Sequence, residues 1–173
     1  MAELVGTIAE RLRTIQEMYD PRMAAELPPH ITLGGSSGMG PIPATTPLEM
    51  LRNVIAPIAA TTSPLVVRFG RPMRFMQSTV VVLPIDPNGP IRTLHERIKS
   101  SGLSFERARF TFTPHCTLSF YPELPRKRLA ELLRVRIDEP VWIDAIQAYR
   151  AANVMRPEKV LQLKLGGVVE HRA

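Results

Sequence analysis

The sequence contains one short pattern twice: Pro-His-x-Thr-Leu occurs at residues 29–33 and again at residues 114–118. β-Branched residues around each His, and a Pro just before it, favour a strand that begins at the motif. Side chains in a strand alternate between faces at about 3.3 Å per residue, so each His and the Thr two positions later leave one face roughly 6.6 Å apart. The residues between and after them then face a core: Ile31, Leu33, Cys116 and Leu118.

Two imidazoles and two hydroxyls on one surface suit the chemistry of a phosphodiester. Breaking a P–O bond removes a proton from the attacking oxygen and gives one to the leaving oxygen. Two histidines with ordinary pKa values near 6.5 can share that work at neutral pH. Threonine hydroxyls can hold the non-bridging oxygens, where charge sits. A single copy of the motif would favour an incidental His in a core strand, whereas two corresponding copies favour a site.

The paired His-x-Thr-Leu motifs, 85 residues apart (115 minus 30), resemble those of the 2H phosphoesterase superfamily, in particular its 2′-5′ RNA ligase-like and cyclic phosphodiesterase branch. The resemblance implies an α+β, bilobal, duplicated fold with two mainly antiparallel sheets, outer helices and a central cleft. It also implies metal-independent chemistry on 2′,3′-cyclic or 2′-5′-linked phosphates, without a cofactor. By motif position, His30 and His115 would be the acid and base, and Thr32 and Thr117 would bind phosphate.

The order of expected elements also repeats. Helix, motif strand, helix, strand and strand follow one another in each half, so we expect residues 1–173 to form a single domain of two pseudo-symmetric lobes. The expected helices cover 7–19, with Thr7 and Glu10 as a capping box, and begin at Pro47 after an N-cap Thr46, at Pro90 and at Pro125. Later strands are expected at 65–69, 78–85, 141–149 and 160–165.

Some boundaries are marked by single residues. Asp20 and Pro21 are expected to end the first helix, and Pro57 to distort or end the helix that begins at Pro47. The superfamily usually begins with an apolar strand, whereas only Leu4 and Val5 precede Gly6 here. The leading strand is therefore expected to be absent, very short or lost through a misassigned start.

Composition limits the class of protein. Apolar content of 45% and charged content of 22% are ordinary for a globular domain. The single cysteine excludes an internal disulfide and the usual cysteine zinc sites, so a reducing cytoplasm is the expected location. No signal-like start or membrane-length apolar run is present, and we expect a monomer that does not contact membranes. The net charge of +6 favours encounter with polyanions without itself establishing nucleic-acid binding.

Histidines and the cysteine outside the motif pairs are given structural interpretations. His95 and His171 lie in no repeated motif, so a solvated or structural role is favoured for both. Cys116 adjoins His115, but strand alternation points the two side chains to opposite faces, which favours a buried and inert thiol. The carboxylates Asp86, Asp138 and Asp144 show no metal-ligand spacing.

Candidates for further substrate contacts are less determined by the sequence. Tyr121 shares strand parity with His115 and could stack on a base, while Phe120 is expected in the core. Arg74, Arg107 and Arg109 could hold phosphate or be solvated surface charges, and Arg109 shares parity with His115 if the strand extends that far back.

The leading hypothesis is a phosphoesterase whose partners are RNA ends or nucleotide 2′,3′-cyclic phosphates, active without metal and able in reverse to form a 2′-5′ linkage. The alternative from another class is a non-catalytic RNA- or nucleotide-binding protein that uses the same basic cleft. A third possibility is an enzyme for a small nucleotide ester.

Overall fold

The computed structural model of the protein describes residues 1–76, 78–150 and 157–166, and its fold is mixed α+β. The helices are α1 (Gly6–Tyr19), α2 (Pro21–Glu26), α3 (Leu48–Ala60), α4 (Pro90–Lys99) and α5 (Arg126–Leu132). The strands are β1 (Ala2–Glu3), β2 (His30–Ile31), β3 (Leu65–Val67), β4 (Met73–Arg74), β5 (Val81–Pro84), β6 (His115–Ser119), β7 (Val141–Ile143), β8 (Ala145–Arg150) and β9 (Glu158–Lys164). All of the paired strands are antiparallel, so the expected fold class is confirmed.

The largest sheet places the two motif strands side by side. Its order is β1-β2-β6-β5-β4, and Ile31 of β2 lies opposite Cys116 of β6. β8 lies beside the start of β1, because the Met1 amine donates to the Gln147 carbonyl at 2.7 Å and the Gln147 amide donates to the Met1 carbonyl at 2.8 Å. Both motifs therefore come from the middle of one sheet.

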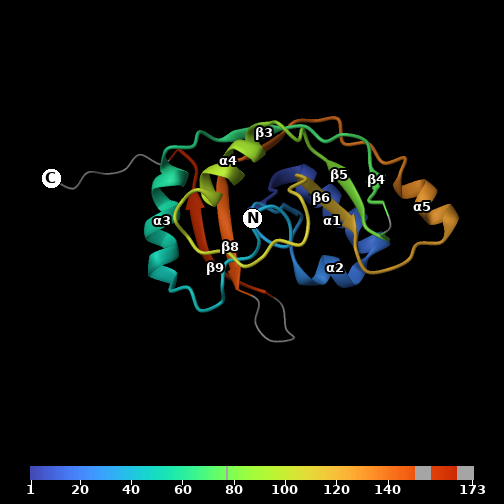
Figure 1. The fold of residues 1–173 in the computed structure, drawn as a ribbon. Coiled ribbons are helices and arrows are strands. Elements are labelled where there is room, and N and C mark those ends of the chain that lie inside the picture. Colours follow the sequence, from blue (N-terminus) through green and yellow to red (C-terminus); the bar gives the residue numbers. More distant parts are fainter. Residues whose placement is uncertain (77, 151–156, 167–173) are drawn as a thin grey trace.

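The remaining strands link the two ends of this sheet. β3 pairs with β7. After β3, the chain continues to β4, which lies beside β5. After β7, it continues to β8, which lies beside β1 and β9. Figure 1 shows α3 beside the β8–β9 hairpin at one end of the molecule and α5 at the other end. The unit strand, helix, motif strand occurs twice, as β1-α1-β2 (with α2 before the strand) and as β5-α4-β6. The origin of this repeat by duplication stays a prediction.

The core side of the sheet carries the apolar residues of both motifs. Ile31, Leu33, Cys116 and Leu118 are each at most 2% exposed, as strand alternation predicts. Helix α1 packs against β6, with Leu12 fully buried, and α4 buries Ile91, Leu94 and Ile98. Burial of one face of the motif strands directs their His and Thr side chains to the other.

Several expected boundaries were wrong at the residue level. Helix α1 has Val5 as its N-cap without a side-chain cap, so Thr7 and Glu10 form no capping box at this helix start. Helix α3 has Pro47, not Thr46, as its N-cap. Pro57 lies within α3, because a proline in the final turn removes only one intrahelical hydrogen bond before the helix ends.

The leading strand is two residues long, which agrees with the expected alternative of a very short strand, and it pairs with β2 through Ala2 and Glu3. Other strand boundaries differ from those expected. The single strand expected at 141–149 is divided at Asp144, because β7 and β8 pair with different partners. The second motif strand ends at Ser119, so it does not extend to Tyr121, whose expected direction relies on strand parity with His115.

Candidate functional site

The two motif strands bring all four predicted polar side chains to one region. Because the strands are antiparallel with Ile31 opposite Cys116, His30 lies opposite Thr117 and Thr32 opposite His115. All four are partly exposed, whereas Ile31 and Cys116 are fully buried. The antiparallel pairing thus gives each imidazole a threonine as its cross-strand neighbour.

Both imidazoles are anchored in the same way. His30 Nδ1 lies 2.8 Å from the carbonyl oxygen of Pro28, and His115 Nδ1 lies 2.6 Å from that of Thr113, in each case two residues earlier. A carbonyl oxygen only accepts hydrogen bonds, so Nδ1 carries the hydrogen in both rings. In the neutral ring, Nε2 then holds the lone pair and is the nitrogen that can receive a proton.

Burial keeps both histidines readily deprotonated. Desolvation lowers the pKa of His30 from 6.5 to about 4, although its hydrogen bond to Pro28 acts in the opposite direction. The charge of His115 contributes further to this lowering, so the two imidazoles lie within electrostatic reach of each other. Desolvation also lowers the pKa of His115, against the effect of its bond to Thr113. Both rings are therefore mainly neutral at pH 7 without ligand.

A small cavity of about 40 Å³ lies beside His30. Its lining includes Thr117 and residues of α1, α2 and the connection to β2: Gln16, Met23, Glu26, Leu27 and Pro28. The sequence pattern does not reveal α2 and its Glu26, because Asp20-Pro21 predicts only the end of α1. The same dipeptide is also a helix start, since Asp20 accepts from the Met23 amide at 3.1 Å and Pro21 occupies the first turn.

An aromatic residue that the sequence reading missed contacts His115. The Phe75 ring meets the His115 ring edge-on, with centroids 5.1 Å apart and planes at 89°. Phe75 follows β4 in a segment that sequence patterns assign only to a connection, so its contact arises from the pairing of β4 with β5. It gives this imidazole an apolar wall.

Tyr121 lies just beyond the end of β6, where strand parity no longer fixes its direction. Its hydroxyl donates to Glu26 Oε2 at 2.6 Å, which raises the pKa of Tyr121, and the Arg22 guanidinium lies 3.9 Å from its ring centre. Glu26 connects this tyrosine to the cavity beside His30. Base stacking by Tyr121 stays a prediction. Phe120 is 50% exposed, so its expected core position was wrong.

Strand pairing does not settle the position of the three uncertain arginines relative to the motif residues. Arg74 lies opposite Val81, which lies opposite Ser119 across a register shift between Val81 and Val82, so strand parity does not assign the Arg74 side chain to a face. Arg107 and Arg109 are exposed in the segment before β6, which begins only at His115. The strand extension that would align Arg109 with His115 is therefore absent.

The buried thiol and the second buried histidine have the surroundings of core residues. Cys116 is fully buried, and desolvation raises its pKa to about 12, as expected for an inert thiol. His95 is 1% exposed, and its Nδ1 donates to the Leu33 carbonyl at 2.7 Å, which confirms a structural position. His171 lies outside the described residues.

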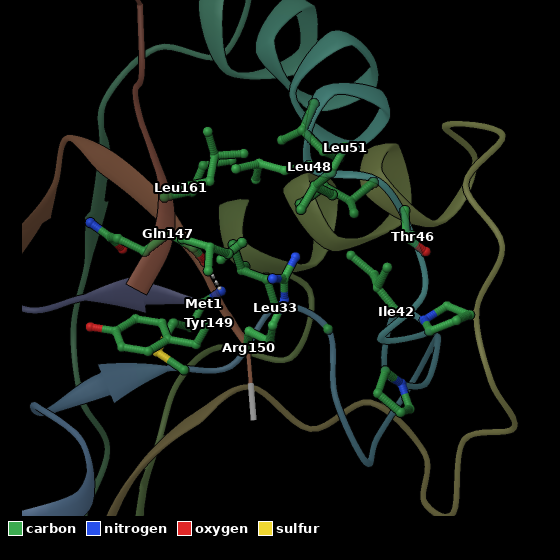
Figure 2. Close-up of a pocket in the computed structure, with 18 of the residues that line it drawn as sticks. Met1, Leu33, Ile42, Thr46, Leu48, Leu51, Gln147, Tyr149, Arg150 and Leu161 are labelled. Carbon is green, nitrogen blue, oxygen red and sulfur yellow. Dashed lines mark hydrogen bonds between the residues drawn. The ribbon is translucent and has the colours of Figure 1, made fainter. Parts of the chain in front are cut away.

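A larger cavity, of about 380 Å³, is lined by neither motif histidine. Figure 2 shows residues of its lining. It lies between α3, the segment after β2 and the β8–β9 hairpin, and its walls include Ile42, Leu51, Leu161 and Arg150. Leu33 lines it from the first motif, on the face away from His30. Size alone does not make this cavity the candidate site, because it contains none of the predicted polar residues.

The described part of the chain contains neither a metal-ligand cluster nor a membrane-spanning helix. In residues 1–76, 78–150 and 157–166, no three His, Cys, Asp or Glu side chains are grouped as metal ligands. Within these same ranges, no helix has the length and apolar character needed to cross a membrane.

Comparison with known families agrees with the position of the motifs. The family model described as the 2′-5′ RNA ligase superfamily matches residues 4–154, which include both motifs. In a comparison with curated proteins, none matches the chain. The family match extends over most of the 173 residues, from directly after β1 to beyond β8. The chain therefore belongs to the 2′-5′ RNA ligase superfamily.

Proposed function

We propose that this protein is a metal-independent phosphoesterase that hydrolyses 2′,3′-cyclic phosphates on RNA ends or nucleotides, with His30 and His115 as base and acid. The observation that carries this proposal is the matched anchoring of the two imidazoles. Each uses Nδ1 to donate to a backbone carbonyl two residues earlier, so each has Nε2 for proton transfer. Membership of the superfamily supports the reaction class.

In the proposed reaction, one imidazole removes a proton from water as the water oxygen attacks phosphorus. The bond from phosphorus to one ribose oxygen breaks, and the other imidazole, in its protonated form, gives its proton to that oxygen. The product is a phosphomonoester with a free ribose hydroxyl. Thr32 and Thr117 hold the non-bridging oxygens, where negative charge accumulates. The same step with an RNA 5′-hydroxyl in place of water, and with the ribose 3′ oxygen as the protonated leaving group, forms a 2′-5′ linkage.

The difference between the two histidines supports an assignment of their roles. His30 has a pKa of about 4 and is neutral over the physiological range, so we assign it as the base. His115 is then the acid. Binding of an anionic phosphate raises the pKa of a neighbouring imidazole, because the anion stabilises the charged ring. The substrate itself thus helps to load the proton on His115.

We also propose a monomeric, cytoplasmic protein whose substrates are RNA ends or nucleotide cyclic phosphates. The net charge of +6 supports encounter with such anions. Tyr121 is the proposed stacking residue, since Glu26 joins it to the cavity beside His30.

The test is hydrolysis of the four nucleoside 2′,3′-cyclic phosphates and a short RNA with a cyclic end, in excess chelator. The parent protein is compared with His30→Ala, His115→Ala and, as a matched control outside both motifs, His171→Ala. We expect turnover by the parent and the control, and loss of at least about 100-fold in each motif variant. The position of the product phosphate identifies the leaving ribose oxygen.

Unchanged turnover in either motif variant would contradict the two-histidine reaction. If the parent binds cyclic-ended RNA without turnover, and the motif variants bind equally well, the protein is a non-catalytic RNA- or nucleotide-binding protein instead. Preference for mononucleotides over RNA ends in a competition assay would favour the small nucleotide ester.

A further inference from the structure

We infer that Gln16 and His95 are positioning residues that hold the two motif strands in place from the core side of the sheet. This inference rests on the proposed function, because it assigns these residues to the geometry of the proposed reaction. Neither side chain forms its hydrogen bond with a motif hydroxyl. Each instead binds the backbone of a motif strand.

Gln16 lies on α1 and is 4% exposed. Its Nε2 donates to the carbonyl oxygen of Thr117 at 2.8 Å. Thr117 is the second motif threonine, and its carbonyl belongs to the same residue whose hydroxyl faces the candidate site. Gln16 also lines the cavity beside His30. Its amide therefore fixes the height of the second motif strand relative to α1.

His95 occupies the corresponding place on α4. Its Nδ1 donates to the carbonyl oxygen of Leu33 at 2.7 Å, directly after the first motif threonine, Thr32. The ring is stacked on Phe112, with centroids 3.6 Å apart and planes at 13°. Gly38 closes over the ring so tightly that a Cβ there would collide with it. These contacts leave the imidazole one orientation, aimed at the first motif strand.

The two hydrogen bonds cross between the halves of the chain. Helix α1 follows β1 in the first half but binds β6 of the second. Helix α4 follows β5 in the second half but binds Leu33, two residues after β2, in the first. Between β2 and β6 themselves, the register rests on the single pair Ile31 and Cys116. The crossed bonds therefore supply restraints on the relative position of the motif strands that this short pairing does not.

Gln16 and His95 each have a second polar atom that forms no hydrogen bond in the core. Within the described part of the chain, Gln16 Oε1 and His95 Nε2 are buried without a hydrogen-bond partner, and the nearest carboxylate oxygen to Nε2, on Glu96, is 3.9 Å away. Buried polar atoms without partners destabilise a fold, and this cost offsets part of what each side chain gains from its single hydrogen bond to Thr117 or Leu33. Their presence favours a role in positioning over a role in stability.

The kinetic test compares variants that remove or keep the donor. Gln16→Met and His95→Leu remove it, whereas His95→Gln keeps an N–H that can reach Leu33, as a glutamine does from α1. Leu12→Met, one turn before Gln16 and fully buried, is the control for a changed core. We expect kcat for cyclic phosphate hydrolysis to fall roughly 10- to 100-fold in the donor-free variants, with KM within about threefold. His95→Gln and Leu12→Met should keep nearly parental kcat.

A readout that needs no turnover separates this inference from the proposed function. The chain has only four histidines, so the ring signals of His30 and His115 can be followed by NMR. We expect His95→Leu to shift the His30 signal and Gln16→Met to shift the His115 signal, while His95→Gln and Leu12→Met leave both in place. Thermal midpoints of the donor-free variants should change little, because each variant removes a buried polar atom without a partner but also leaves one carbonyl oxygen without its donor.

Three results would overturn the inference: unchanged ring signals in both donor-free variants, unchanged kcat in both, or losses in kcat that follow the thermal midpoint in all four variants. Failure of His95→Leu to fold, with His95→Gln also failing, would make His95 a purely structural residue and also overturn it. A parent protein without turnover but with the expected NMR shifts would reject the proposed function and retain the positioning role.

Discussion

The two motif histidines have equivalent anchors but different surroundings. Each donates from Nδ1 to a carbonyl, yet His30 lies beside a cavity formed by α1 and α2, whereas His115 meets the edge of Phe75. Desolvation dominates the lowered pKa of both, and the charge of His115 lowers that of His30 further. An acid–base pair needs such a difference, because one ring must be neutral when the other is protonated.

These shifts predict a pH profile displaced to the acid side. The base must be deprotonated, which for His30 requires a pH above about 4, and the acid must be protonated, which for His115 requires a pH below its lowered pKa. We therefore expect kcat/KM for cyclic phosphate hydrolysis to pass through a maximum below pH 6.5. The kcat profile should lie at higher pH, since bound phosphate raises the pKa of the acid. A kcat/KM maximum above pH 7.5 would contradict the assignment.

At the scale of single residues, the sequence predicts what repeats within it and misses what depends on tertiary contacts. The four motif residues are recognisable because both copies share one pattern. Phe75 and Glu26 approach the histidines only through the pairing of β4 with β5 and the turn into α2. The sequence does carry a signal for Gln16, because this polar residue lies four positions after Leu12, on the buried side of α1.

Among the elements, α2 depends on one buried carboxylate. Asp20 is 1% exposed, and its two oxygens accept from the amides of Met23, Phe120 and Tyr121 at 2.7 to 3.1 Å. The residue therefore begins α2 and also fixes the chain just after the second motif strand. This contact connects two parts of the candidate site that are about 100 residues apart, as their separations of 100 and 101 show.

We expect Asp20→Ala to lower the free energy of unfolding by about 2 to 4 kcal/mol, because it leaves three amides without their acceptor. Urea denaturation measures the loss. Glu17→Ala, at an exposed position on the adjacent helix, should change it by less than about 0.5 kcal/mol. Equal stability of the two variants would show that water replaces the carboxylate without cost.

The segment after the first motif strand packs against the segment before the second. Gly38 donates to the Phe110 carbonyl at 2.9 Å, and the Glu106 amide donates to the Pro41 carbonyl at 2.9 Å. Gly40 has φ of +84°, and a Cβ there would collide with the Glu106 carbonyl oxygen. The sequence marks 36–46 only as a loop rich in glycine and proline, because this close approach has no local signature.

Gly40→Ala should therefore destabilise the protein more than Gly102→Ala. Gly102 has a similar φ of +86°, but nothing lies within 4 Å of a Cβ built there. We expect Gly102→Ala to cost about 1 to 2 kcal/mol from backbone strain alone, and Gly40→Ala to cost more, because backbone must also move. Parallel urea denaturation curves provide the comparison, and equal losses would contradict the close packing.

Prediction of elements succeeds where periodicity is strong. The apolar stripes of α1, α3 and α4 predict those helices, but caps and ends depend on contacts outside the helix. Pro57 remains inside α3 because a proline in the final turn removes only one intrahelical hydrogen bond. Asp144 divides β7 from β8 because the two halves of that segment pair with different strands. The short leading strand is real because β2 and β8 both bind it.

At the scale of the whole molecule, the fold brings together two motifs 85 residues apart (115 minus 30) in one sheet. The antiparallel pairing of β3 with β7 joins the halves at a second place, after which the chain reaches opposite ends of the sheet (Figure 1). The sequence predicts the repeated order of elements, but it does not reveal that the motif strands are direct neighbours, since strand order follows from long-range pairing.

The net charge of the molecule predicts how its substrates respond to salt. A chain with +6 charges attracts a polyanion more strongly than a mononucleotide, and salt screens that attraction. We expect KM for a short cyclic-ended RNA to rise between 50 and 200 mM salt, on the order of several-fold, while KM for a nucleoside cyclic phosphate changes little. Identical salt dependence for both would indicate that the basic surface does not contact the RNA strand.

The most direct test of the central claim is a double-mutant cycle on cyclic phosphate hydrolysis in chelator, with the parent, His30→Ala, His115→Ala and the double variant. If the two imidazoles act together in one step, each single substitution should reduce kcat by about 100- to 10,000-fold, and the double substitution should reduce it little further. Near-parental kcat in either single variant would contradict the account.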